Sequence, residues 1–206
     1  MNAMVGKLRA VKVVDGFAPG AVIDIARTLD DLMQVMTVRA LVYMAGQSCP
    51  YEEEFDGNDF AAATHLIARL GKEPIAVMRI RWFPGFAKFE RVAVRPEHRG
   101  GGVVRQMVNA AFDLAARRGY RKVLGHIQAR LLPFWERSGG LKARPGRPRF
   151  TFSDHEYIEV ERELTPPPDA LNEDSDPLVL LRPEGQWDRP GVLDRSALRP
   201  ATCPLG

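Results

Sequence analysis

The sequence predicts a mixed α/β domain built on a sheet that is mostly antiparallel. Two turn signals, Gly71-Lys72-Glu73 and Pro84-Gly85, separate three apolar runs, which is typical of a β-meander. A strongly periodic helix over 103–118 follows only after this meander. Because strands and helices do not alternate strictly along the chain, a doubly wound parallel sheet is not expected.

The first elements in this order are a strand at 22–26 and a long helix. Thr28 and Asp31 form an approximate capping box, and the apolar residues behind them recur at helical spacing, which predicts a helix over 28–44. Residues 47–58 are polar, acidic and broken by a proline and a glycine, so we expect a loop or a short second helix there.

The remaining elements follow from the same two periodicities. Apolar residues mark one face of the helix over 103–118, and Gly119 ends it. The other predicted elements are strands at 65–70, 74–82, 88–94 and 121–127, a short helix at 131–138, and a closing hairpin of 150–152 with 157–162.

The C-terminal segment differs in composition from the rest of the chain. It holds eight of the 16 prolines, starting from the run Pro166-Pro167-Pro168. Its seven acidic residues and four arginines give it a charge of −3, although the whole chain has +3. We therefore expect a domain over 1–165 and an extended or partly disordered arm over 166–206, with a strand at 178–181 as its one regular element. This acidic arm would fold over a ligand groove or bind a second subunit, so a homodimer is possible.

Composition excludes several classes of protein. Hydrophobic residues make up 45% and charged residues 27% of the chain, and no apolar run is long enough for a membrane helix. Met1 to Lys12 lacks a signal-peptide pattern, so we expect a cytoplasmic protein without a membrane partner. Two cysteines and four scattered histidines give no disulfide framework, and no metal site is expected. The basic body suits a polyanion, but no nucleic-acid-binding motif accompanies it.

A glycine-rich loop is the most informative local pattern. The apolar strand ending at Val94 is followed by Arg99-Gly100-Gly101-Gly102 and then by the long helix. Glycines let peptide N–H groups approach a ligand, and a helix start adds unpaired donors and a positive dipole end, so the loop predicts a pyrophosphate site. Neither a GxGxxG fingerprint nor a P-loop is present. A plain glycine turn before a helix is the alternative.

These residues resemble the GNAT superfamily of N-acetyltransferases. Its motif of Arg or Gln, two residues, Gly, one residue, and Gly or Ala falls on Arg99, Gly102 and Val104, and Val104 departs from the small residue. Residues 128–139 resemble the second signature, an aromatic helix that ends in glycine. The stretch 49–59, followed by a strand that begins at His65, is similar to the ElaA-type subfamily. The resemblance covers about residues 22–164.

The resemblance implies a sheet that is splayed at a CoA site, with helices on both faces, and direct acetyl transfer from acetyl-CoA to an amine. The acetyl oxygen would receive a backbone N–H from Val92 or Val94. The residues expected to bind the cofactor are Val92, Ala93, Val94, Arg99, Gly100, Gly101, Gly102, Val103, Val104, Gln128, Phe134 and Trp135.

Proton transfer would fall to three candidates. Glu90 is the first choice for general base because it lies on the strand that leads into the loop; strand alternation would turn it away from Arg91, and one of the two would line the acceptor cleft. Trp135 stands where many family members have a tyrosine acid. The proton would therefore come from another residue or from water, and Tyr157 and His126 are the candidate residues.

The acceptor is expected to be a small-molecule or peptide amine. Arg91, Tyr51 and Glu54 are the residues expected to contact it. The acidic residues of 52–59 would attract a cation such as a polyamine, a lysine or a protein N-terminus, although a solvated loop explains the same pattern.

Three other functions fit parts of the sequence. Acyl-homoserine-lactone synthases, which take acyl groups from carrier proteins, share a Glu-x-Asp stretch before a strand that begins with His, as at Glu54, Asp56 and His65. A non-catalytic CoA-binding module would tolerate the departure at Val104. Nucleic-acid binding rests on charge alone.

Overall fold

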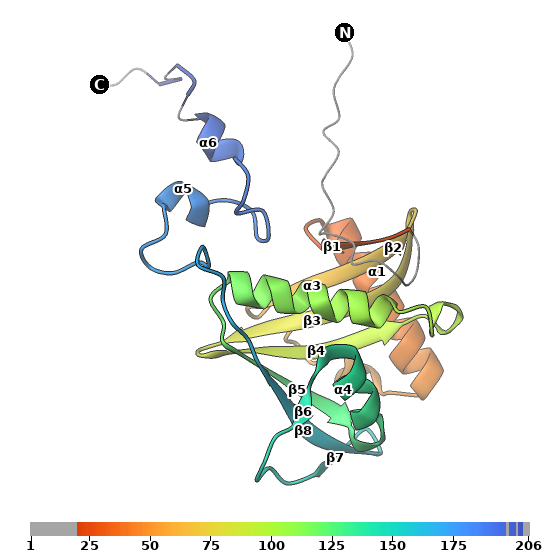
Figure 1. Ribbon diagram of the computed structural model, residues 1–206. Helices are drawn as coiled ribbons and strands as arrows, with labels where there is room; N and C mark the ends of the chain where they lie inside the picture. Colours follow the sequence, from red (N-terminus) through yellow and green to blue (C-terminus); the bar gives the residue numbers. More distant parts are fainter. Residues whose placement is uncertain (1–19, 197, 201, 204–206) are drawn as a thin grey trace.

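The computed structural model describes residues 20–196, 198–200 and 202–203 (Figure 1). An eight-stranded sheet in the order β1-β2-β3-β4-β5-β8-β6, with β7 paired to β8, forms its centre. The β4–β5 pair is parallel, whereas the other pairs are antiparallel, which confirms the predicted mixed sheet. The strands are β1 (Ala21–Ile25), β2 (Ala63–Leu70), β3 (Glu73–Phe83), β4 (Phe86–Val94), β5 (Lys122–Gln128), β6 (Lys142–Ala143), β7 (Phe150–Phe152) and β8 (His155–Glu163).

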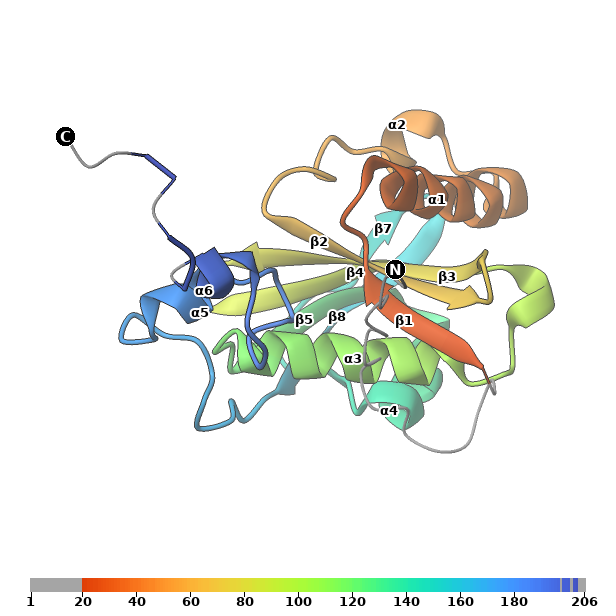
Figure 2. The ribbon, with the colours of Figure 1, turned by 90° about the horizontal axis from the view of Figure 1, so that it is seen from above.

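Helices cover both faces of this sheet (Figure 2). On one face lie α1 (Leu29–Arg39), the π-helical turn η1 (Ala40–Ala45) and α2 (Tyr51–Glu54). On the other face lie α3 (Val103–Arg117) and α4 (Leu132–Gly139). The expected capping box is present at Thr28 and Asp31. The helix expected over 28–44 is α-helical from Leu29 to Arg39 and continues as the wider π-helical turn η1.

Each face of the sheet has its own hydrophobic core. The larger one lies under α3, whose Met107, Val108 and Ala111 are fully buried. The smaller one lies under α1, where Val35 and Val38 pack on Val77 of β3. Burying apolar side chains on both faces is what makes this three-layer arrangement stable.

A β-bulge interrupts β4 next to its pairing with β5. Val77 of β3 lies opposite Ala93, and Arg79 lies opposite Glu90, so β4 contains one more residue than β3 between these pairs. Arg91 takes up the extra length with a φ of 52°, a conformation that costs most residues about 1–2 kcal/mol. The bulge reverses the alternation, so Glu90 and Arg91 do not face opposite ways as predicted.

The C-terminal segment contains a short helix where the sequence predicts a strand. Residues 178–181 do not form a strand, because Asp176 caps the short helix α5 (Pro177–Leu180), and a second helix, α6 (Val192–Ser196), follows. Glu184 accepts a hydrogen bond from Thr64 (2.8 Å) and pairs with Arg118 at the end of α3. Leu171 and residues 184–188 of the arm therefore pack beside the C-terminal end of α3, about 20 Å from the glycine loop by helical rise.

The segment Met1 to Lys12, for which the sequence predicts no signal peptide, lies outside the described residues. Across the described ranges, no helix combines the length and hydropathy that a membrane span requires.

Candidate active site

A cleft of about 1060 Å³ opens where β4 and β5 separate. The two strands pair only from Ala87 to Phe89 on β4 and from Val123 to Gly125 on β5. Beyond these pairs the bulged half of β4 diverges from β5, and residues of both strands line the cleft. The opening therefore results from a short parallel pairing followed directly by the bulge.

One end of the cleft is suited to an anion. Gly100 and Gly102 have φ of 82° and 76°, and a Cβ at Gly100 would meet no atom within 4 Å. Among the residues that the structure describes, no side chain caps α3, so its first N–H groups are available to a ligand. Arg99 of the loop and Arg105 in the first turn of α3 line the cleft here, and Arg130, which follows β5, lines it as well. Here backbone geometry and charge favour the same ligand, a phosphate group.

The peptide groups of β4 continue the cleft. Tyr43 donates its hydroxyl to the carbonyl of Val92 (2.6 Å), and Arg99 donates to the carbonyl of Val94 (3.2 Å). Both carbonyls therefore point away from β3. Since the N–H and C=O of one strand residue point to the same side, the N–H groups of Val92 and Val94 also face the divergence.

Gln128 ends β5 on the opposite wall of the cleft. Its side chain is 8% exposed and its Oε1 has no hydrogen-bond partner within the described structure. Leaving a buried acceptor unpaired costs about 1–3 kcal/mol, so the site lacks a donor that a ligand amide would supply. Phe134 and Trp135 pack edge-to-face (5.3 Å) on the same wall.

The three residues predicted to transfer protons all line the cleft: Glu90, His126 and Tyr157. Glu90 accepts hydrogen bonds from Arg79 (3.0 Å) and lies 2.9 Å from Lys88 Nζ. His126 Nε2 lies 3.3 Å from a Glu159 oxygen. Burial, followed by the charge of Lys88, lowers the pKa of His126, which favours a neutral imidazole near pH 7.

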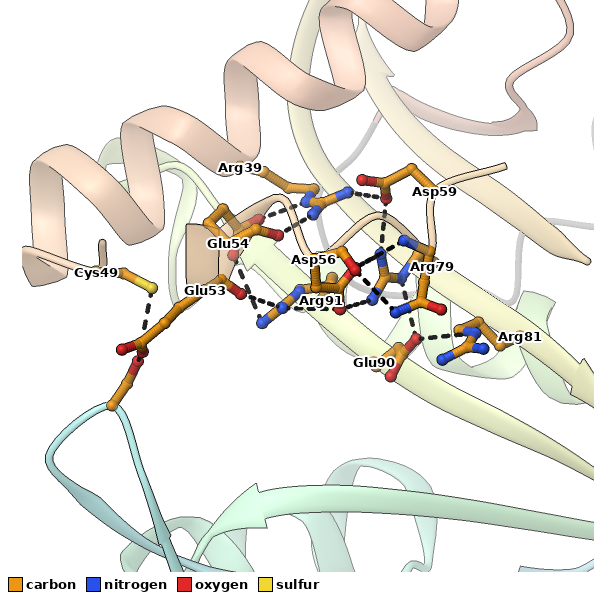
Figure 3. A network of polar contacts seen from close by, with 12 residues as sticks. Arg39, Cys49, Glu53, Glu54, Asp56, Asp59, Arg79, Arg81, Glu90 and Arg91 are labelled. Atoms are coloured by element: carbon orange, nitrogen blue, oxygen red, sulfur yellow. Dashed lines mark hydrogen bonds and ion pairs between the residues drawn. The ribbon is translucent and has the colours of Figure 1, made fainter. Parts of the chain in front are cut away.

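A buried ion-pair network lies beside Glu90 and Arg91, two residues of the cleft lining (Figure 3). Arg39 and Arg79 are almost fully buried, and both bind Asp59. The pKa of Asp59 is lowered, because the hydrogen bonds and charges of these arginines outweigh a burial effect that alone would raise it. Arg91 completes the network through Asp56 (3.1 Å) and the backbone oxygen of Glu53 (2.6 Å). The acidic segment is thus tied to the sheet rather than solvated.

Two of the predicted acceptor contacts do not fit the structure. Glu54 is fully buried and bonded to Arg39, and burial raises its pKa, so its carboxylate does not reach the cleft. Tyr51 is 65% exposed, packs against Phe55 with the rings tilted by 51°, and lies outside the cleft lining. Arg91, the third predicted contact, does line the cleft.

The predicted cofactor residues line the cleft with two exceptions, Ala93 and Gly101. The Ala93 side chain is buried under α1, because after the bulge the odd-numbered residues face that helix. Those that do line it are Val92, Val94, Arg99, Gly100, Gly102, Val103, Val104, Gln128, Phe134 and Trp135.

The sequence reading missed several residues of the site. Tyr43 follows α1 in helical phase and gives no local signal of a strand contact. Arg79 did give a sequence signal, because a charged residue inside the apolar run 75–80 indicates a buried acid that pairs with it. Phe150 and Phe152 of β7 also line the cleft.

Comparisons with known proteins agree with this geometry. The model of the acetyltransferase (GNAT) family matches residues 30–139. The uncharacterized N-acetyltransferase YjcF of Bacillus subtilis is 30% identical over 115 residues, which are 56% of this chain and 81% of that protein.

Solved structures give the same fold. An acyl-CoA N-acyltransferase from Pseudomonas aeruginosa is 26% identical, has a TM-score of 0.62, and matches 69% of this chain and 97% of its own. Escherichia coli ElaA, at 22% identity and a TM-score of 0.61, matches 68% of this chain and 99% of its own. The likeness to ElaA is one of fold alone.

Proposed function

This chain belongs to the GNAT family of acetyltransferases, and on that premise we propose that it moves an acetyl group from acetyl-CoA to a primary amine by direct transfer. The observation that supports this most is the cleft, in which β4 and β5 part beside an uncapped, glycine-rich helix start. Bound acetyl-CoA supplies a thioester carbonyl that an amine can attack.

The polarity of the cleft supports the proposed pair of substrates. Arg99 and Arg105, in the glycine loop and the first turn of α3, line the end that would hold the phosphates. Glu52 and Glu53 line the cleft as well, on α2, which is remote in sequence from the glycine loop. An anionic donor and a cationic acceptor would thus meet complementary charge at different ends.

The residues along the cleft have separate proposed roles. The N–H groups of Gly100 to Arg105 bind phosphate oxygens, and Gln128 accepts a hydrogen bond from a pantetheine amide. The N–H of Val92 or Val94 donates to the acetyl oxygen, where negative charge develops.

Glu90 and His126 are the two proposed proton acceptors. The contact with Glu159 favours the tautomer in which His126 Nε2 carries the proton, which leaves Nδ1 to take one from the amine. Tyr157 remains the proposed donor to the leaving thiolate. Comparing Glu90→Gln, His126→Gln and Tyr157→Phe as pH profiles of kcat/KM would assign these roles, with a loss of about 10²–10⁴-fold for the true base.

The cofactor site is tested by two matched glycine variants. Gly100 and Gly85 share a φ of 82°, and at both a Cβ would meet no atom within 4 Å, so replacement by alanine strains both equally. Gly100 lines the cleft, whereas Gly85 lies in the β3–β4 turn. We expect Gly100→Ala to raise the Kd for acetyl-CoA at least about tenfold in calorimetric titration, and Gly85→Ala to leave it unchanged.

Turnover is tested by following thiol release with a panel of amines, and with long-chain acyl-CoA as an alternative donor. Release that depends on amine and on acetyl-CoA supports the proposal. Equal Kd values for the two glycine variants, or tight binding without turnover on any amine, would contradict it.

A further inference from the structure

We propose that Glu53 binds a second cationic group of the acceptor, so that the preferred substrate is an aliphatic diamine or polyamine. This inference rests on the proposed acetyl transfer and narrows its substrate class. It is carried by the charge balance of the site, the position of Glu53 and the rings around it.

Apart from Glu52, which is exposed on α2, the other acids beside the acceptor end already have cationic partners. Asp56 pairs with Arg79 (2.7 Å) and Arg91 (3.1 Å), and Glu90 pairs with Arg79 and Lys88. The full set of pairs joins Arg39, Arg79, Arg91 and Lys88 to Glu54, Asp56, Asp59 and Glu90, with Arg81 at 3.9 Å from Glu90. These four acids therefore leave no negative charge free for a ligand.

Glu53 is different from these acids. No ion pair reaches its carboxylate from any described residue, although its backbone oxygen is held by Arg91 (2.6 Å). Figure 3 shows its side chain directed away from the arginines. Glu53 lines the cleft, so its charge is both unpaired and accessible to a substrate.

The β7–β8 hairpin fixes the Glu53 carboxylate in place. Ser153 donates its hydroxyl to Glu53 Oε2. Ser153 and Asp154 have φ of 43° and 60°, which is the geometry of a tight two-residue hairpin turn. The hydroxyl is thus positioned by the backbone turn, and it uses only one of the two carboxylate oxygens.

Aromatic rings surround the same part of the cleft. Tyr157 packs against Phe150 (5.9 Å) and Phe152 (5.6 Å), and all three line the cleft. Ring faces attract alkylammonium groups and pack well on methylene chains. The Arg91 guanidinium already lies over the Phe152 ring, 6.0 Å from its centroid. The carboxylate together with the rings of Phe150 and Tyr157 is a suitable receptor for the distal ammonium of a flexible aliphatic amine.

Glu53 is better suited to a distal cation than to the reacting amine. A carboxylate that held the reacting nitrogen as an ammonium ion would stabilise its unreactive form. Glu90 and His126 line the cleft near the divergence of β4 and β5, where transfer is proposed. Glu53 lies on α2 and contacts the hairpin instead.

The test compares 1,4-diaminobutane with butylamine, which has the same chain but one charge. We expect the wild-type protein to favour the diamine at least about tenfold in kcat/KM, and Glu53→Gln to abolish this preference while changing butylamine less than about threefold. Glutamine still accepts the Ser153 hydroxyl, so the hairpin contact is kept. Asp154→Asn, a neighbouring charge removal outside the cleft lining, should retain the preference.

Charge reversal gives a second measurement. Glu53→Lys should favour 4-aminobutyrate over the diamine. Equal rates for the two amines in the wild type, or a preference retained in Glu53→Gln, would overturn the inference while leaving amine acetylation intact. If acetyl-CoA binds but no amine is acetylated, the proposed function and this inference both fall.

Discussion

Removing the central arginine of the buried network tests whether these ion pairs support the fold. Arg79 is 1% exposed and binds Asp56, Asp59 and Glu90. Replacing one partner of a buried pair typically costs about 3–5 kcal/mol, because it leaves uncompensated charge. Each of the three acids keeps a second cation, Arg91, Arg39 or Lys88, so we expect Arg79→Met to cost about 3 kcal/mol, at the lower end.

Urea denaturation followed by circular dichroism measures this loss. With a slope of about 2 kcal/mol per molar urea, the midpoint should fall by about 1.5 M without a change in slope. Arg95→Met is the matched control: Arg95 also binds two acids, but Glu73 and Glu97 are 60% and 51% exposed. Such surface pairs contribute about 0–1 kcal/mol.

Arg79→Lys keeps the charge but not the three-way geometry, so its midpoint should lie between those of the wild type and Arg79→Met. A midpoint for Arg79→Met within 0.3 M of the Arg95→Met value, that is within about 0.6 kcal/mol, would refute the reasoning. The network would then be no more important than a surface pair.

Two further predictions follow from the arm and from a buried histidine. Deleting residues 166–206 should lower Tm by about 5 °C but leave the KM for acetyl-CoA within twofold, since Glu184 contacts the far end of α3; a fivefold rise in KM would restore the idea that the arm covers the groove. Burial lowers the pKa of His65 below 6.5, so the unfolded state binds more protons than the folded state and stability falls as pH drops below about 7, by at most about 1.4 kcal/mol per pH unit. His65→Gln should flatten this slope between pH 7 and 5.5 in urea titrations, and an unchanged slope would assign it to other groups.

The periodic parts of the fold were predictable from local pattern. The helix over 103–118 and the meander of three strands came from apolar spacing and turn residues, and the structure confirms them as α3 and β2 to β4. The short helix α5 was not, because a run of four apolar residues suits a strand or a helix equally. β6 has only two residues and leaves no periodicity to read.

The site was predictable where backbone chemistry defines it and not where tertiary contacts do. Gly100 and Gly102 could be expected at the cleft because a glycine-rich turn directly before a helix start is visible in the sequence. Glu54 was misjudged because nothing local distinguishes a carboxylate that points to solvent from one paired with Arg39, 15 residues earlier. The preceding residue, Glu53, reaches the cleft because the side chains of successive helical residues point about 100° apart.

Because of the bulge at Arg91, odd-numbered residues face α3 in the first half of β4, whereas even-numbered residues face it in the second half. Ala87 and Phe89 pack beneath α3 before the bulge, and Val92 and Val94 do so after it. Deleting one residue here would restore an uninterrupted ladder, but it would send either the first pair or the second pair to the wrong layer. Insertions and deletions at this point would therefore change the packing of both cores, whereas substitutions of Glu52 and Glu53, which line the cleft outside the ion-pair network, would leave the phase of the strand unchanged. An alignment of relatives should place no gap between Glu90 and Val92, and two chains that differ in length there would differ in the layout of both cores.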